Sequence, residues 1–161
     1  MSRLLVVHHT PTATVQRLAE AVVAGTRDEA ITGVEVVVRP ALEATAEDVL
    51  AADGYLLGTP ANFGYMSGAL KHFFDSVFLA VGGSLGSDGQ GTEPAGPRKP
   101  FGLWVHGRYD TTGAVRSVTS IVQALGWRPA AEVLEVLGEV TEQDLAAGYD
   151  LGGTLAALVE P

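Results

Sequence analysis

The chain has 161 residues, 47% of them hydrophobic, which suits a single domain that buries roughly 70% of its unfolded surface. It contains no cysteine, and this excludes disulfides, thiolate metal ligands and cysteine nucleophiles. A net charge of −9 with only 10 scattered lysines and arginines argues against nucleic acid as a partner, and no apolar stretch approaches the ~20 residues that span a membrane.

Strands and helices are predicted to alternate along the first half of the chain. A buried parallel strand is expected at residues 4–8. The apolar run within residues 1–9 is too short for a signal peptide, so we expect a cytoplasmic protein. Apolar residues at helical spacing then predict a helix across 15–23. A β-branched strand at 34–38 follows, and after it a short helix capped by Thr45.

The second half continues this alternation. A third strand is expected at 55–58 and a third helix at 67–79, with Ser67 as its cap. Residues 82–100 are rich in glycine and proline and predict a mobile loop. The remaining elements are a strand at 101–106, a helix near 115–125, a strand at 133–137 and a last helix capped by Thr141. Nothing in the sequence indicates a repeat or a second domain, so we expect one domain over 1–161.

Alternating strands and helices predict an α/β fold with a parallel sheet that is covered by helices on both faces. Right-handed crossovers then bring the loops that follow the strands to one edge of the sheet. Open sheets of this kind bind their ligands at that edge. The loops concerned are residues 9–14, 59–66 and 107–113.

The first loop offers hydroxyl groups and backbone N–H groups at the start of a helix, which suit an anion. Its candidate ligand-binding residues are Thr10, Pro11, Thr12, Ala13 and Thr14. A threonine that only caps the helix remains the alternative. No G-x-x-x-x-G-K-[ST] or G-x-G-x-x-G motif is present, so we expect a monophosphate group on a compact ligand.

The second loop combines aromatic rings with glycines that let a ligand approach the backbone, and we expect it to hold a flat ligand. Its candidate residues are Pro60, Ala61, Asn62, Phe63, Gly64, Tyr65 and Met66. The alternative is an ordinary surface turn in which Phe63 packs against the protein.

The third loop carries an aromatic ring, a cation and several hydrogen-bonding groups. Its candidate residues are His106, Gly107, Arg108, Tyr109 and Asp110. Tyr109 could cover a flat ligand, whereas Arg108 and Asp110 could equally be a solvated pair in a turn.

Histidines stand at the ends of two expected strands, at positions 8, 9 and 106, where packed or surface roles are commoner than catalysis. Without cysteine or clustered carboxylates near them, no metal site is expected. No G-x-S-x-G motif indicates a serine hydrolase, and the acidic residues of a phosphate receiver domain are missing after the first and third strands. The sequence assigns no catalytic residue.

The segment from Gly58 to Met66, G-T-P-A-N-F-G-Y-M, followed by Phe73-Phe74-Asp75, resembles the flavodoxin-like superfamily. The likeness is strongest to the NAD(P)H:quinone oxidoreductases of the tryptophan-repressor-binding-protein type and to the NADPH-dependent FMN reductases. It implies a flavodoxin-like three-layer sandwich whose five-stranded parallel sheet has the order 2-1-3-4-5. Compared with the usual family pattern, Ala13 replaces a common glycine and Pro11 removes a backbone donor.

The resemblance also implies noncovalent FMN, with its phosphate on 10–14, its isoalloxazine ring against 60–66, and 106–110 on the other side. The implied function is an FMN-dependent oxidoreductase that moves electrons from NAD(P)H to a quinone or another small-molecule acceptor. A homodimer or tetramer is left open. Two alternatives remain, an electron-transfer flavodoxin and a degenerate flavodoxin-fold binding module with weak or no FMN affinity.

Overall fold

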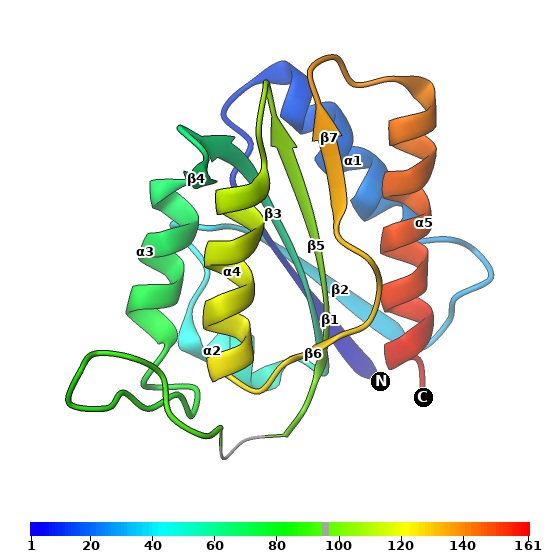
Figure 1. Cartoon of the computed structure of the whole chain (residues 1–161). Helices are drawn as coiled ribbons and strands as arrows, with labels where there is room; N and C mark the ends of the chain where they lie inside the picture. The colour runs from blue at the N-terminus through cyan, green and yellow to red at the C-terminus, as the bar shows by residue number, and fades with distance from the viewer. Residues whose placement is uncertain (95–96) are drawn as a thin grey trace.

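A mostly parallel β-sheet forms the centre of the computed structural model, which describes residues 1–94 and 97–161 (Figure 1). Its main strands are β1 (Ser2–His8), β2 (Val34–Pro40), β3 (Gly54–Asn62), β5 (Pro100–Gly107), β6 (Arg128–Pro129) and β7 (Leu134–Leu137). The strand order is β2-β1-β3-β5-β6, and β7 also pairs with β5 in parallel. The predicted order is therefore confirmed, with β6 and β7 sharing the fifth position.

Helices cover both faces of this sheet, as predicted. They are α1 (Ala13–Thr26), α2 (Ala46–Ala51), α3 (Gly68–Val77), α4 (Thr112–Ala124) and α5 (Glu142–Val159). Thr45 and Thr141 each form a capping box at the start of α2 and α5, and Ser67 caps α3, as the sequence indicated. Within the part of the chain that the structure describes, no helix has the length and apolar character needed to cross a membrane.

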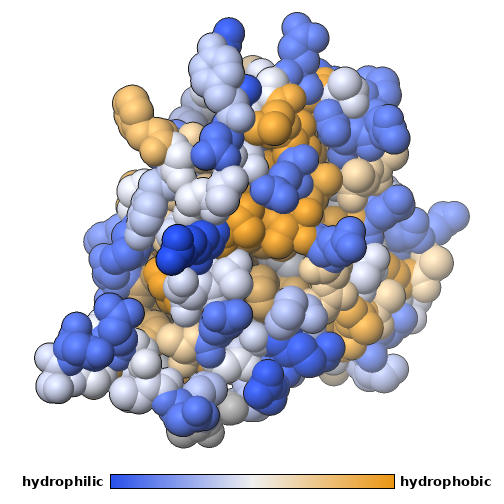
Figure 2. All heavy atoms as spheres, in the orientation of Figure 1, coloured by the Kyte–Doolittle hydropathy of each residue, from blue (hydrophilic) through white to orange (hydrophobic). Residues whose placement is uncertain are grey.

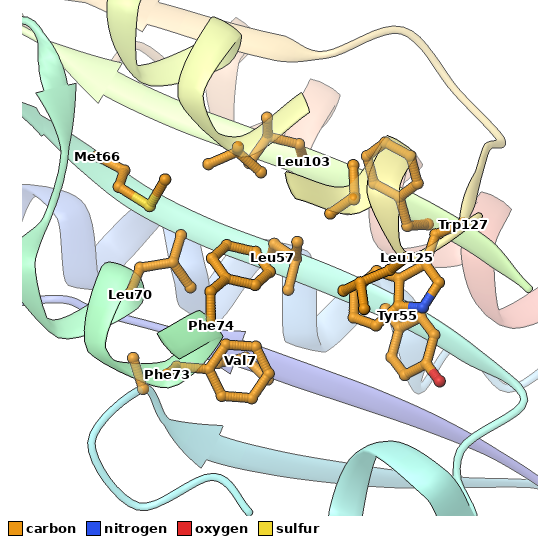
Figure 3. Close-up of a cluster of buried hydrophobic side chains, with 14 of the residues drawn as sticks. Val7, Tyr55, Leu57, Met66, Leu70, Phe73, Phe74, Leu103, Leu125 and Trp127 are labelled. Carbon is orange, nitrogen blue, oxygen red and sulfur yellow. The ribbon is translucent and has the colours of Figure 1, made fainter. Parts of the chain in front are cut away.

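Side chains that alternate along the buried strands create two hydrophobic cores. Leu5 and Val7 of β1 point to the face covered by α2, α3 and α4, whereas Leu4 and Val6 point to the face covered by α1 and α5. This is the two-residue period of a strand buried on both sides. Figure 3 shows the first core, in which aromatic side chains from α3 pack over β1 and β3.

The predicted third strand and second loop need a correction, because β3 continues to Asn62 and does not end at residue 58. It then turns back into β4 (Tyr65–Met66), which pairs antiparallel with Ala61 and Asn62. Pro60 is tolerated in the extension because pairing with β1 stops at Gly58, leaving one side of the strand free. Most of the expected loop is thus a β-hairpin.

The glycine-rich segment folds locally into a second hairpin. Leu85 and Gly91 form a β-bridge, and the N–H of Thr92 donates to the carbonyl of Ser84 at 3.0 Å. Residues 95–96 of the predicted loop lie outside the described residues, and Pro100 already belongs to β5. Mobility of the segment stays a prediction.

Candidate cofactor-binding site

The three predicted loops meet at the carboxyl edge of the sheet, because β1, β3 and β5 are adjacent and parallel. The tip of the β3–β4 hairpin also touches the start of α4. A Cβ atom added to Gly113 would lie 2.0 Å from the carbonyl oxygen of Gly64. Only glycine allows this approach, and it fixes the hairpin beside the loop that follows β5.

The first loop runs directly into α1, whose N-cap is Thr12. The Thr12 hydroxyl accepts from the N–H of Val15 at 3.4 Å, so the capping alternative is correct for this threonine. The backbone N–H groups of Ala13 and Thr14 lie in the first turn, where a helix supplies no partner. Both residues are exposed, and α1 has no acidic residue in its first turn, unlike α2 and α5. The electropositive end of α1 is therefore open to an anion.

Phe63 occupies an unusual position at the tip of the hairpin. Phe63 has a φ of +52° and Gly64 a φ of +76°, the pattern of a two-residue type I′ turn. Bulky residues rarely adopt this left-handed conformation, and the Phe63 side chain is fully exposed. The alternative in which Phe63 packs against the protein is therefore wrong. An exposed ring on a strained backbone is typical of a functional position.

Thr59 anchors the hairpin, a role that the sequence did not predict. Its buried hydroxyl donates to the carbonyl of Pro60 at 2.8 Å and accepts from the N–H of Ser67 at 2.9 Å. Ser67 in turn accepts from the N–H of Leu70 and so starts α3. The only signal in the sequence is a hydroxyl residue between a glycine and a proline, a pattern that ordinary turns share.

The third loop presents Tyr109 to solvent, with 84% of the residue exposed. Arg108 lies over this ring, 5.8 Å from its centroid, and its Nε donates to the phenol oxygen at 3.2 Å. Asp110 instead accepts from the N–H of Thr112 at 3.0 Å, a bond that lowers the pKa of its carboxyl. Arg108 and Asp110 thus have separate partners and are not a turn pair.

Two contacts tie the third loop to β7 and to the residue that follows it. The hydroxyl of Thr111 donates to Glu135 at 2.6 Å, and Nε2 of His106 bonds the carbonyl of Gly138 at 2.6 Å. His106 is half-buried, so it holds the loop in place, as expected of a packed histidine. Within residues 1–94 and 97–161, no three histidine or acidic side chains are grouped as a metal ion would need.

His8 lies beneath the first loop, half-buried, with its Nδ1 3.2 Å from the hydroxyl of Thr10. Burial, and secondarily the neighbouring His9, lower the pKa of His8. An unfolded histidine keeps a pKa of about 6.5, so below that pH the unfolded chain binds the additional proton more readily. Stability contributed by neutral His8 is therefore present above this value and is lost as the pH falls from it through the lower pKa of the folded protein.

We therefore expect the free energy of unfolding to fall between about pH 7.5 and about pH 5.5, and to fall less in a His8→Gln variant. Urea denaturation at the two pH values measures both slopes. His72→Gln, at an exposed histidine on α3, is the matched control. Equal slopes for the wild type and His8→Gln would contradict the assignment.

A family model described as NADPH-dependent FMN reductase matches residues 9–138, which include all three loops. The chain belongs to this family. Residues 9–138 also contain β2, β3, β5 and the hairpin that presents Phe63, so the family match covers both the sheet edge and the exposed ring.

Two curated relatives accompany this match. A flavodoxin from Aquifex aeolicus (strain VF5) is 40% identical over 85 residues, which cover 53% of this chain and 45% of the relative. A quinone NAD(P)H dehydrogenase from Acidithiobacillus ferrooxidans (strain ATCC 53993 / BNL-5-31) is 30% identical over 132 residues, 70% of this chain and 62% of the relative. The chain thus spans less than two thirds of either relative.

A solved flavodoxin from the domain Archaea has the same fold. It superposes with a TM-score of 0.76 at 18% identity, over 98% of each chain. This likeness confirms the flavodoxin-like arrangement of sheet and helices.

The chemistry of the described residues fits FMN. The open N-terminus of α1 suits a phosphate, and exposed rings at Phe63, Tyr65 and Tyr109 stand on the two neighbouring loops. Phe63 and Gly64 lie beyond the last paired residues of the hairpin, so their N–H groups make no hydrogen bonds within the strand ladder. These N–H groups can donate hydrogen bonds to the edge of a heterocycle.

Proposed function

We propose that this protein is a cytoplasmic FMN-binding oxidoreductase that takes electrons from NAD(P)H and delivers them to a quinone or another small acceptor. The observation that carries the proposal is the pair of solvent-exposed rings, Phe63 and Tyr109, on adjacent loops at the sheet edge where α1 begins with the N–H groups of Ala13 and Thr14. Exposed aromatic side chains without a packing role are costly, and a flat ligand between the loops would remove both from water.

Each loop then has its own role in holding the cofactor. The N–H groups of Ala13 and Thr14 would bind the phosphate, with hydroxyls of the same loop as further donors. Phe63 and Tyr109 would contact the isoalloxazine ring. Thr59 would hold the hairpin in position through its hydrogen bond with Ser67. Bound FMN supplies hydride acceptance and electron release, while these residues supply position and hydrogen bonds.

An electron-transfer flavodoxin is the second candidate, and the 40% identity to a flavodoxin over 85 residues favours it. The two candidates differ in the electron donor. An enzyme leaves one face of the flavin open so that a nicotinamide can stack on it, whereas a carrier is reduced by a partner protein.

A titration of FMN with the purified protein tests the shared part of both proposals. We expect flavin fluorescence to be quenched at a 1:1 ratio, and protein that leaves the fluorescence unchanged would support a degenerate binding module instead. Anaerobic stopped-flow mixing of the FMN-loaded protein with NADPH and with NADH then separates the candidates. Rapid bleaching of the flavin absorbance supports the reductase, and no bleaching with either nucleotide supports the carrier.

A further inference from the structure

A groove separates α3 from α4 and reaches Tyr65 of the β3–β4 hairpin. Its cavity of about 700 Å³ has the size of a small-molecule site. Phe74 of α3 and its C-cap residue Phe78 line one side, and Ile121 and Ala124 line it from α4. Figure 2 shows small hydrophobic areas among hydrophilic side chains between these helices, while its largest hydrophobic surface lies on the other side of α4, over β5 and β7.

The hairpin at residues 84–92 closes the lower end of the groove. A Cβ atom added to Gly91 would lie 2.4 Å from Cβ of Ala124, and one added to Gly83 would lie 2.6 Å from the ring of Phe78. The hairpin backbone therefore rests directly on both helices. Leu85 from this hairpin adds a further apolar side chain to the cavity.

Two basic residues line the rim of the groove, and among the described residues only one of them is paired with a carboxylate. Lys71 is neutralised by Asp75, whose Oδ1 lies 2.7 Å from its Nζ. Arg116 on α4 is exposed, and in residues 1–94 and 97–161 no carboxylate lies within 4.0 Å of it. In a chain of net charge −9, an unneutralised guanidinium beside an apolar groove favours a ligand with a negative group.

We propose that the groove between α3 and α4 is a second ligand site, which binds an aromatic acid. The planar ring lies against the half-buried side chains of Phe78, Ile121 and Ala124, and the carboxylate or sulfonate group pairs with Arg116. Tyr65 lines the end of the groove nearest the sheet edge, so the site adjoins the flavin crevice without using its phosphate loop. No residue of the phosphate loop lines the groove, so the site is tested on the protein without cofactor.

The probe is 1-anilinonaphthalene-8-sulfonate, and its uncharged counterpart is N-phenyl-1-naphthylamine, which has the same rings without the sulfonate. Fluorescence titration should show saturable binding of both. Arg116→Gln should weaken the sulfonate about fivefold, the upper end for an exposed ion pair, and leave the amine unchanged. Arg128→Gln removes the same charge from an exposed position on β6 and should change neither.

A second pair of variants tests the cavity itself. Ser120→Trp places a large ring in the groove and should abolish saturable binding of both probes, whereas Gln123→Trp, outside the groove on the same helix, should not. Tyr109→Leu in the flavin crevice should also leave binding intact. The proposal is overturned if neither probe binds, if Arg116→Gln weakens both probes equally, or if Ser120→Trp has no effect.

Discussion

Replacement of Gly152 by alanine is expected to lower the free energy of unfolding by about 2–3 kcal/mol, although alanine favours helices over glycine by about 1 kcal/mol. A Cβ atom at this position of α5 would lie 1.9 Å from the carbonyl oxygen of Val22 in α1. Gly25 of α1 is in the reciprocal position, where a Cβ would lie 1.9 Å from the carbonyl oxygen of Tyr149. The two helices therefore pack backbone against backbone.

The expected loss of stability in Gly152→Ala is large because backbone atoms would have to move. A backbone oxygen cannot rotate aside as a side chain can, so α1 and α5 would have to separate. Leu18 and Leu155, both fully buried between these helices and the sheet, would lose contacts in doing so. This loss outweighs the gain in helix propensity.

The adjacent glycine supplies the control. A Cβ atom at Gly153 would meet nothing closer than the carbonyl oxygen of Gly25 at 3.5 Å, an ordinary contact. Gly153→Ala should therefore keep or slightly raise stability, while Gly152→Ala should lower the melting temperature by about 5–10 °C. Urea and thermal denaturation measure both, and equal stability of the two variants would refute close packing of the helices.

The arrangement of the sheet was predictable because its central strands are apolar on both faces. The run at Leu4–Val7 is buried throughout, and helical spacing correctly located α3 over Phe73 and Phe74. The split of the last strand was not predictable. Trp127, just before β6, stacks on Tyr55 of β3 with ring centroids 3.8 Å apart, and such a tertiary contact leaves no local pattern.

Part of the candidate site was also predictable from the sequence, and part was not. Convergence of the three loops follows from topology alone, so the sequence could predict it. Individual roles depend on partners that are distant along the chain, such as Glu135 for Thr111. The left-handed conformation of Phe63 was equally hidden, because the turn type is set by the pairing of Asn62 with Tyr65.

Tyr109→Leu is expected to weaken FMN binding about 10- to 100-fold, the loss typical of one stacking ring. The side chain is 84% exposed and its one described hydrogen bond is to Arg108, so the fold does not depend on it. The free energy of unfolding without FMN should therefore change by no more than about 0.5 kcal/mol. Fluorescence titration with FMN and urea denaturation measure the two quantities on the same preparation.

Tyr109→Phe separates the ring from its hydroxyl. It retains the aromatic face and removes only the phenol oxygen that accepts from Nε of Arg108, so FMN affinity should stay close to that of the wild type. A loss equal to that of Tyr109→Leu would mean that the hydroxyl orders the loop through Arg108. Unchanged affinity in both variants would mean that Tyr109 does not contact the flavin, and Phe63→Leu would then show whether the opposite loop alone holds the ring.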